Sequence, residues 1–129
     1  MSLDRPDQPP HFPRPAPIDS YGRGGFRFAG MSHRGSLLLL PSGIWAWPVT
    51  EPSGIDAHTL APVLAEADAI GLLLIGTGRS RWPLPIELMQ LFARHGISAE
   101  TSRTGQAANT YNILLEEGRK VAAALIAVD

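Results

Sequence analysis

The fold is decided by two stretches, LLLIGTG at residues 72–78 and ETSRTGQAANTYNILLEEGRKVAAALIAV at residues 100–128. The first is an apolar run of strand length that leads into a glycine loop, as expected for a strand covered on both faces. The second predicts the end of a strand, a helix from Thr104 to about Glu117, and a last strand over 121–128. Thr104 is a residue type that favours the N-cap position. Strands that alternate with helices indicate an α/β domain with a largely parallel sheet.

The region before these stretches predicts a β-hairpin and a short strand. Residues 35–40 and 44–47 are apolar runs separated by the turn residues Pro41-Ser42-Gly43. Residues 26–28 alternate as a further short strand. The hairpin is expected to add antiparallel strands, which makes the sheet mixed.

Two further helices are predicted between the hairpin and the last helix. Apolar residues at 60, 63, 64 and 67 predict an amphipathic helix that starts near His58 or Thr59. A second helix is predicted over about 85–94, ended by Gly96 in the manner of a left-handed cap. The residues of this second helix that are expected to pack are Ile86, Leu88, Met89, Phe92 and Ala93.

Length and composition indicate one globular domain behind a short tail. The chain has 129 residues, of which 44% are hydrophobic and 18% are charged, and this suits a single α/β domain over residues 18–129. Six of its 12 prolines lie in residues 1–17, so this segment is predicted to be a flexible proline-rich tail. The alternative is that this proline-rich segment is a ligand recognised by another protein.

Charge, cysteine content and hydropathy narrow the classes of partner. The net charge is −1, so no global field favours nucleic acid. The chain has no cysteine, which fits a reducing cytoplasm and excludes thiolate metal ligands. Its apolar runs fall short of the roughly 20 residues that a membrane helix needs. The four histidines lack metal-ligand spacing, so neither a metal nor another cofactor is expected.

The best candidate site lies where the first of these stretches ends and the second begins. If the strands that end at Ile75 and Thr101 are parallel, their loops meet at the carboxyl edge of the sheet, where open α/β folds bind ligands. Arginines beside the first amides of a helix favour an anion. The alternative is a tight turn with solvated arginines, since neither the Walker loop nor the dinucleotide fingerprint is present. The candidate residues are Gly76, Thr77, Gly78, Arg79, Arg81, Arg103 and Thr104.

Three polar residues farther along the chain complete the candidate set. Asn112 falls on the apolar side of its helix, so its amide is expected to pin a neighbouring loop, with a ligand contact as the alternative. Glu117 and Arg119 flank the glycine that stops this helix, and either side chain could pair with another loop. They are candidate site residues because of the family resemblance described below. No nucleophile elbow or catalytic triad is visible, and no catalytic residue is assigned.

Several motifs in this order resemble one small α/β family. That family includes mitochondrial complex I assembly factor 3, the adipogenesis-associated MTH-domain-containing protein and many short bacterial proteins. The resemblance covers roughly residues 18–128. The motifs are Gly22-x-Gly24-Gly25-Phe26, Gly35-Ser36-Leu37-Leu38, Trp45, Leu73-Leu-Ile-Gly76-Thr-Gly78, Thr104-x-x-Ala107, Thr110-Tyr-Asn112 and Glu117-Gly-Arg119.

The resemblance implies three layers around a mixed sheet of about five strands, with helices on both faces. It also implies a non-enzymatic role in the assembly of respiratory complex I through protein partners. One departure is the short proline-rich tail, which stands where the mitochondrial relative has a presequence. Two other functions stay open: a module that binds a small anionic ligand at the candidate residues, and an enzyme of unrecognised type that uses the same crevice.

Overall fold

The computed structural model describes residues 10–129. The first nine residues of the predicted tail therefore lie outside the described residues. From residue 11 the chain runs beside the sheet, because the amide of His11 donates to the Ile44 carbonyl at 2.8 Å. The Ile44 amide in turn donates to the Phe12 carbonyl at 2.9 Å. The division into a tail and a domain at residue 17 stays a prediction.

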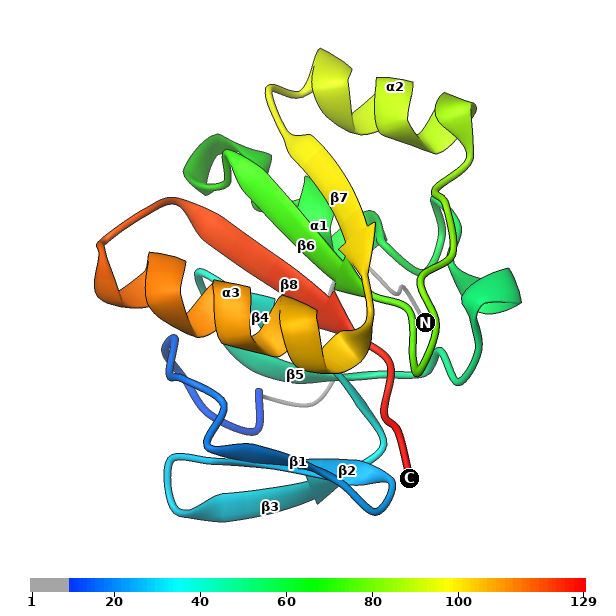
Figure 1. The fold of residues 1–129 in the computed structure, drawn as a ribbon. Helices are drawn as coiled ribbons and strands as arrows, with labels where there is room; N and C mark the ends of the chain where they lie inside the picture. Colours follow the sequence, from blue (N-terminus) through cyan, green and yellow to red (C-terminus); the bar gives the residue numbers. More distant parts are fainter. Residues whose placement is uncertain (1–9) are drawn as a thin grey trace.

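A five-stranded mixed sheet forms the centre of the molecule (Figure 1). Its order is β5-β4-β8-β6-β7, with β8 in the middle. β6 runs parallel to both β7 and β8, whereas β4 is antiparallel to both β5 and β8. The strands are β4 (Ser36–Leu40), β5 (Gly43–Trp47), β6 (Leu72–Gly76), β7 (Ser98–Ser102) and β8 (Val121–Leu125).

The predicted mixed sheet of about five strands is confirmed, and its description as largely parallel is wrong. Of the four pairs of neighbours, two are parallel and two are antiparallel. The reason is that β4 pairs with the central strand β8 in the opposite direction, so the β4–β5 pair occupies one half of the sheet. Only the other half consists of parallel strands.

Both faces of the sheet are buried, and successive residues of each strand enter different cores. Leu38, Leu73 and Ala122 belong to one hydrophobic cluster, whereas Leu39 and Ala123 belong to the other. This alternation follows from the period of two in an extended strand. The alanines of β8 add little bulk at the middle of the sheet, which lets the covering elements approach closely.

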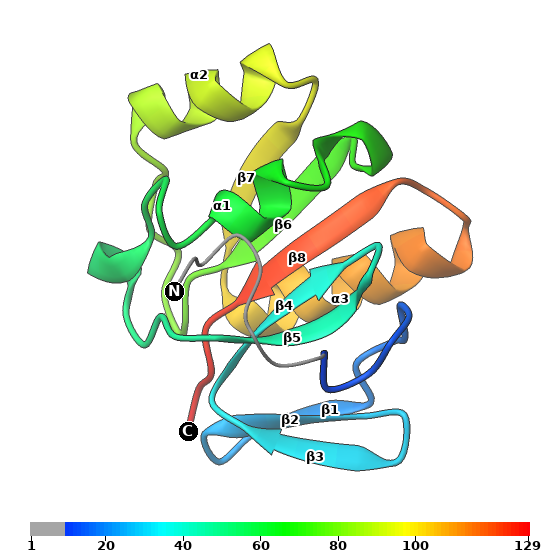
Figure 2. The same cartoon turned by 180° about the vertical axis from the view of Figure 1, so that it is seen from behind.

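Each face of the sheet is covered by different elements (Figures 1 and 2). Phe92 of α2 and Val63 of α1 pack into the first cluster. Tyr111 of α3 and Phe28 of β2 pack into the second, where a small antiparallel sheet β1-β2-β3 joins α3. The covering elements are α1 (Ala61–Leu64), α2 (Ile86–Arg94), α3 (Thr104–Glu116), β1 (Ser20–Gly22), β2 (Gly25–Phe28) and β3 (Met31–Arg34).

The helix predicted to start near residue 58 is much shorter than expected. α1 has only four residues, and 3₁₀ turns lie at Pro52–Gly54 and Ala67–Ala69. After α1 the amide of Glu66 donates to the Val63 carbonyl at 3.1 Å. This bond spans three residues, as in a 3₁₀ turn, whereas the bonds of an α-helix span four. The carboxylate of Glu66 accepts from the amide and the hydroxyl of Ser42, at 2.9 and 2.5 Å. This contact holds the segment after α1 against the β4–β5 turn.

Asn112 joins α3 to the start of the domain. Its Oδ1 accepts from the Ile18 amide at 2.8 Å, and its Nδ2 donates to the Ile18 carbonyl at 2.8 Å. The side chain of Ile18 is buried beside this pair. The expectation that Asn112 pins a neighbouring segment is met by Ile18, which lies 94 residues away in the chain.

We expect Asn112→Leu to lower the free energy of unfolding by roughly 1–3 kcal/mol, because both backbone groups of Ile18 lose their partner. Urea unfolding followed by circular dichroism measures this change. Asn109→Leu is the matched control, since Asn109 is exposed on the same helix. An equal effect of the two substitutions would contradict a structural role for Asn112.

Candidate functional site

The parallel pairing of β6 and β7 brings the two candidate loops together. Gly76 is the register partner of Ser102, so the Gly76-Thr77-Gly78 turn and the start of α3 lie at the same edge of the sheet. An added Cβ at Gly76 would lie 2.8 Å from the Cα of Thr104. Glycine is therefore required at position 76 for the strand and the helix to meet.

Thr104 holds this edge together from inside the protein. Its Oγ1 donates to the Ile126 carbonyl at 2.7 Å and accepts from the Gly78 amide at 3.0 Å. Its own amide donates to the Gly78 carbonyl at 2.9 Å. Thr104 is fully buried, and it is the first residue of α3, so its assignment as N-cap is wrong. Arg103 occupies the cap position and makes no side-chain cap bond.

Thr77 is bonded within the protein in the same way. Its amide donates to the Ser102 carbonyl at 2.9 Å, and its Oγ1 lies 2.6 Å from the Ser80 carbonyl as a donor. The same oxygen accepts from the Trp82 amide at 3.0 Å. The hydroxyls of Thr77 and Thr104 thus serve the turn itself, and the groups left for a ligand are the neighbouring arginines.

A hollow of about 720 Å³ lies beside this turn. Arg79 and Arg103 supply its cationic side chains, and Nη2 of Arg79 lies 3.4 Å from the Asp129 carbonyl oxygen. We call this hollow the crevice. Its lining residues are Tyr21, Gly78, Arg79, Arg103, Gly105, Gln106, Asn109, Thr110, Val128 and Asp129.

The other predicted site residues do not reach the crevice. Nε of Arg81 donates to the Thr101 carbonyl at 3.1 Å on β7. Asn112 is bonded to Ile18, as described above. Glu117 and Arg119 follow the opposite end of α3, where both are exposed and form a 4.0 Å ion pair with each other. The structure therefore brings the two loops together. It places Asn112, Glu117 and Arg119 away from the crevice that lies beside these loops.

The shifted pKa values belong to groups outside the crevice. Burial raises the pKa of Tyr111 to about 12, on the core side of α3. A hydrogen bond from the backbone of Thr59 lowers the pKa of Asp56 in the turn before α1. Burial, together with nearby His11, lowers the pKa of His33 on β3. Each shift has a structural cause, and none identifies an acid or base aimed at a common point.

Within residues 10–129, no group of three or more His, Asp or Glu side chains is placed to hold a metal ion. Over the same residues, no helix has both the length and the apolar character that crossing a membrane requires.

An exposed apolar surface on α2 was not predicted from the sequence. The side chains of Ile86 and Met89 are 59% and 42% exposed, although both were expected to pack. Ala93 is exposed as well, whereas Leu88 and Phe92 are buried as predicted. Positions 86, 89 and 93 follow i, i+3 and i+7, so they form a second apolar side of the helix. That spacing was the signal available in the sequence.

Fold and site together define a small α/β domain whose carboxyl sheet edge is closed by its own hydrogen bonds. The model of the family described as "Protein of unknown function (DUF498/DUF598)" matches residues 18–126. The chain belongs to this family, and the resemblance predicted from its motifs is confirmed.

Named relatives extend this assignment. An uncharacterised protein of Rhodobacter capsulatus is 42% identical over 117 residues, which cover 91% of this chain and 89% of that protein. NADH dehydrogenase [ubiquinone] 1 alpha subcomplex assembly factor 3 of Mus musculus is 32% identical over 115 residues. That match covers 89% of this chain but only 62% of the mouse protein.

Solved structures share the fold. A crystal structure described as an outer membrane protein of Bartonella henselae is 51% identical, with a TM-score of 0.89, and the match covers 92% of this chain and all of that one. An NMR structure of a Rhodopseudomonas palustris protein is 50% identical, with a TM-score of 0.83 and coverage of 96% and 92%. A Bordetella pertussis protein described as a Mth938-like domain is 27% identical, with a TM-score of 0.77 and coverage of 87% and 85%.

We expect Thr104→Val to lower the free energy of unfolding by roughly 1–3 kcal/mol, because the Gly78 amide and the Ile126 carbonyl lose a buried partner. Chemical denaturation gives the value. Thr110→Val provides the control, being the same exchange on the same helix. Should the two variants unfold at the same denaturant concentration, Thr104 would not be the junction described above.

Proposed function

We propose that this protein is a non-enzymatic interaction module that assists the assembly of the respiratory NADH dehydrogenase, complex I. The observation that carries the proposal is the exposed apolar surface at α2. We define the α2 face as the exposed side chains of Ile86 and Met89 on α2 together with that of Trp82 in the loop before it. The names of the mouse and human relatives, which call both proteins NADH dehydrogenase assembly factors, suggest the kind of partner.

The composition of the α2 face is typical of protein interfaces. Trp82 is 56% exposed and lies in the loop that precedes α2. Tryptophan and methionine are enriched at protein interfaces and depleted on the rest of the surface. A patch of exposed apolar side chains marks a surface that a binding partner can cover.

A groove of about 460 Å³ adjoins the α2 face. Trp82, Leu84 and Ile55 give it apolar walls, and Pro52, Pro83 and Pro85 limit the flexibility of its rim. Thr101 also lines the groove, and its buried Oγ1 has no hydrogen-bond partner within the described chain. A partner segment that enters this groove would cover its apolar walls.

We expect Trp82→Ala to weaken the binding of complex I subunits about tenfold or more, as truncation of a central interface tryptophan commonly does. The tagged full chain is captured from its native cells at endogenous expression, and recovered NADH dehydrogenase subunits are quantified by mass spectrometry. Ile86→Ser is expected to reduce recovery as well.

The matched control is Ile113→Ser, because Ile113 is 58% exposed on α3, nearly the same as Ile86. It is expected to retain wild-type recovery. Absence of NADH dehydrogenase subunits from the wild-type capture would refute the assembly role, and equal loss in both isoleucine variants would refute the α2 face.

A second candidate function is the binding of a small anion in the crevice. Its support is the approach of Arg79 and Arg103 to one hollow beside the first turn of α3. Guanidinium groups favour carboxylate and phosphate ligands. This candidate does not need the α2 face, so the two functions can be tested separately.

We expect Arg103→Ala to leave the melting temperature nearly unchanged in water, because Arg103 is exposed, and to reduce the thermal stabilisation produced by inorganic phosphate. Thermal shift assays on the full chain measure both values. Arg94→Ala, which removes an exposed charge from α2, is the control. Undiminished stabilisation of the Arg103 variant would remove this residue from an anion site.

We also propose a cytoplasmic location, to be tested by cell fractionation. The Bartonella henselae relative is described as an outer membrane protein, so recovery of this chain in a membrane fraction is the result that would overturn it.

A further inference from the structure

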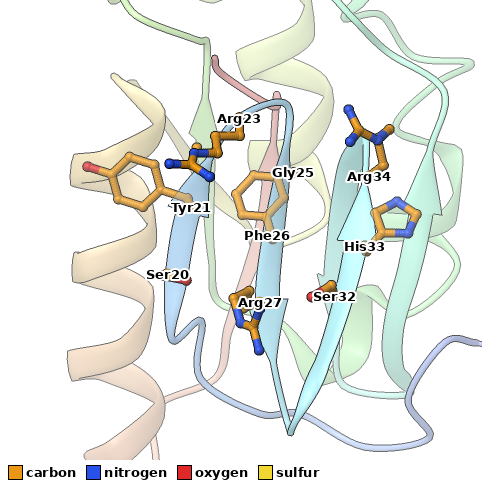
Figure 3. A pocket seen from close by; sticks show the side chains of 10 residues that line it. Ser20, Tyr21, Arg23, Gly25, Phe26, Arg27, Ser32, His33 and Arg34 are labelled. Atoms are coloured by element: carbon orange, nitrogen blue, oxygen red, sulfur yellow. The ribbon is translucent and has the colours of Figure 1, made fainter.

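The small sheet β1-β2-β3 carries a basic hollow that neither candidate function uses (Figure 3). The hollow has a volume of about 590 Å³. Three arginines line it: Arg23 from the turn between β1 and β2, Arg27 from β2 and Arg34 from the end of β3. All three side chains are exposed. We call this feature the arginine hollow.

The strand register places the charged and hydroxyl groups on one side of the sheet. Arg27 is paired with Ser20 on β1 and with Ser32 on β3. Directly paired residues of antiparallel strands point to the same face, and this is the solvent face because Phe26 and Phe28 are buried on the other. Arg27 thus lies between two hydroxyls.

The next row of the sheet leaves space beside these groups. It consists of Gly22, Gly25 and Arg34, so only one of its three positions has a side chain. A Cβ at Gly25 would lie 2.3 Å from the His33 carbonyl oxygen, which excludes any other residue there. The open floor of the hollow is therefore a consequence of how β2 and β3 approach each other.

Positive charge is concentrated at this sheet. Residues 20–36 contain three arginines and no aspartate or glutamate, although the whole chain has a net charge of −1. Among the described residues, no hydrogen bond or ion pair is made by the side chains of these arginines. Burial, together with His11, lowers the pKa of His33, so the arginines supply the charge of the hollow at neutral pH.

The chemistry of these groups selects the ligand. Guanidinium groups have donors and no acceptor, and their planar fork matches the oxygens of a phosphate. A phosphate monoester has a charge of about −1.5 to −2 at neutral pH, so two linked phosphates approximately balance three arginines. The volume is within the range of small-molecule sites. We propose that the arginine hollow binds a small phosphate-bearing molecule, with a diphosphate as its best-matched group.

The test is a titration of the isotope-labelled full chain with pyrophosphate, followed by amide NMR spectra at low ionic strength. Saturable shifts are expected at residues 20–36. Arg27→Ala and Arg34→Ala are each expected to raise the dissociation constant about tenfold. Inorganic phosphate should bind more weakly than pyrophosphate, and the tricarboxylate citrate distinguishes phosphate recognition from recognition of charge alone.

Arg94→Ala is the charge-matched control, since it removes one positive charge from α2, far from the β1-β2-β3 sheet (Figure 1). Its affinity should equal that of the unmodified chain. Arg27→Gln replaces Arg27→Ala if the latter loses the dispersed spectrum of a folded protein. Tyr21 lines both this hollow and the crevice, so its own shift is not diagnostic.

Four results would overturn the proposal. The first is a titration that does not saturate, and the second is saturable shifts confined to Arg79 and to residues 103–106 at the crevice. The third is an equal loss of affinity in the Arg94 and Arg27 variants, and the fourth is citrate bound as tightly as pyrophosphate. Because no readout involves the α2 face or complex I, failure here is separate from failure of the proposed function.

Discussion

The close contact between the end of β6 and the start of α3 determines the rest of the structure. Gly76 has room for no side chain, because Thr104 occupies the space where a Cβ would lie. The hydroxyl of Thr104 then binds both the turn after β6 and the carbonyl that follows β8. One buried side chain therefore connects three segments that are distant in sequence. This contact fixes the first residue of α3 against the carboxyl edge of the sheet.

This junction also explains why the surfaces proposed for function lie around the sheet edge and not within it. Open α/β sheets commonly bind ligands beyond the carboxyl ends of their strands. Here the hydroxyls and amides at that position are engaged in bonds to the protein itself, which leaves the outer arginines facing the crevice. The same turn positions the α2 face, since Thr77 accepts a hydrogen bond from the amide of Trp82. Structural roles and the proposed functional roles are thus divided between neighbouring residues of one loop.

This chain and its relatives share one domain, and in this chain that domain presents two separate surfaces. The mouse assembly factor extends well beyond the region that this chain matches, so the shared part is the α/β domain. In this chain α2 and the β1-β2-β3 sheet lie on opposite faces of the central sheet (Figures 1 and 2). A protein partner on α2 and a phosphate ligand on β1-β2-β3 could consequently be bound at the same time.

The sequence by itself determined the strands around the glycine turn, the extent of α2 and α3, and the meeting of the two candidate loops. These features depend on local periodicity, on glycine and on the ends of parallel strands. Tertiary structure decided that β4 runs antiparallel to β8, that Asn112 binds Ile18, and that Ile86 and Met89 remain exposed. It also gathered three arginines onto one small sheet. The physical reason is that periodicity shows which side chains share a face of one element, whereas the surface that meets this face comes from residues far away in the chain.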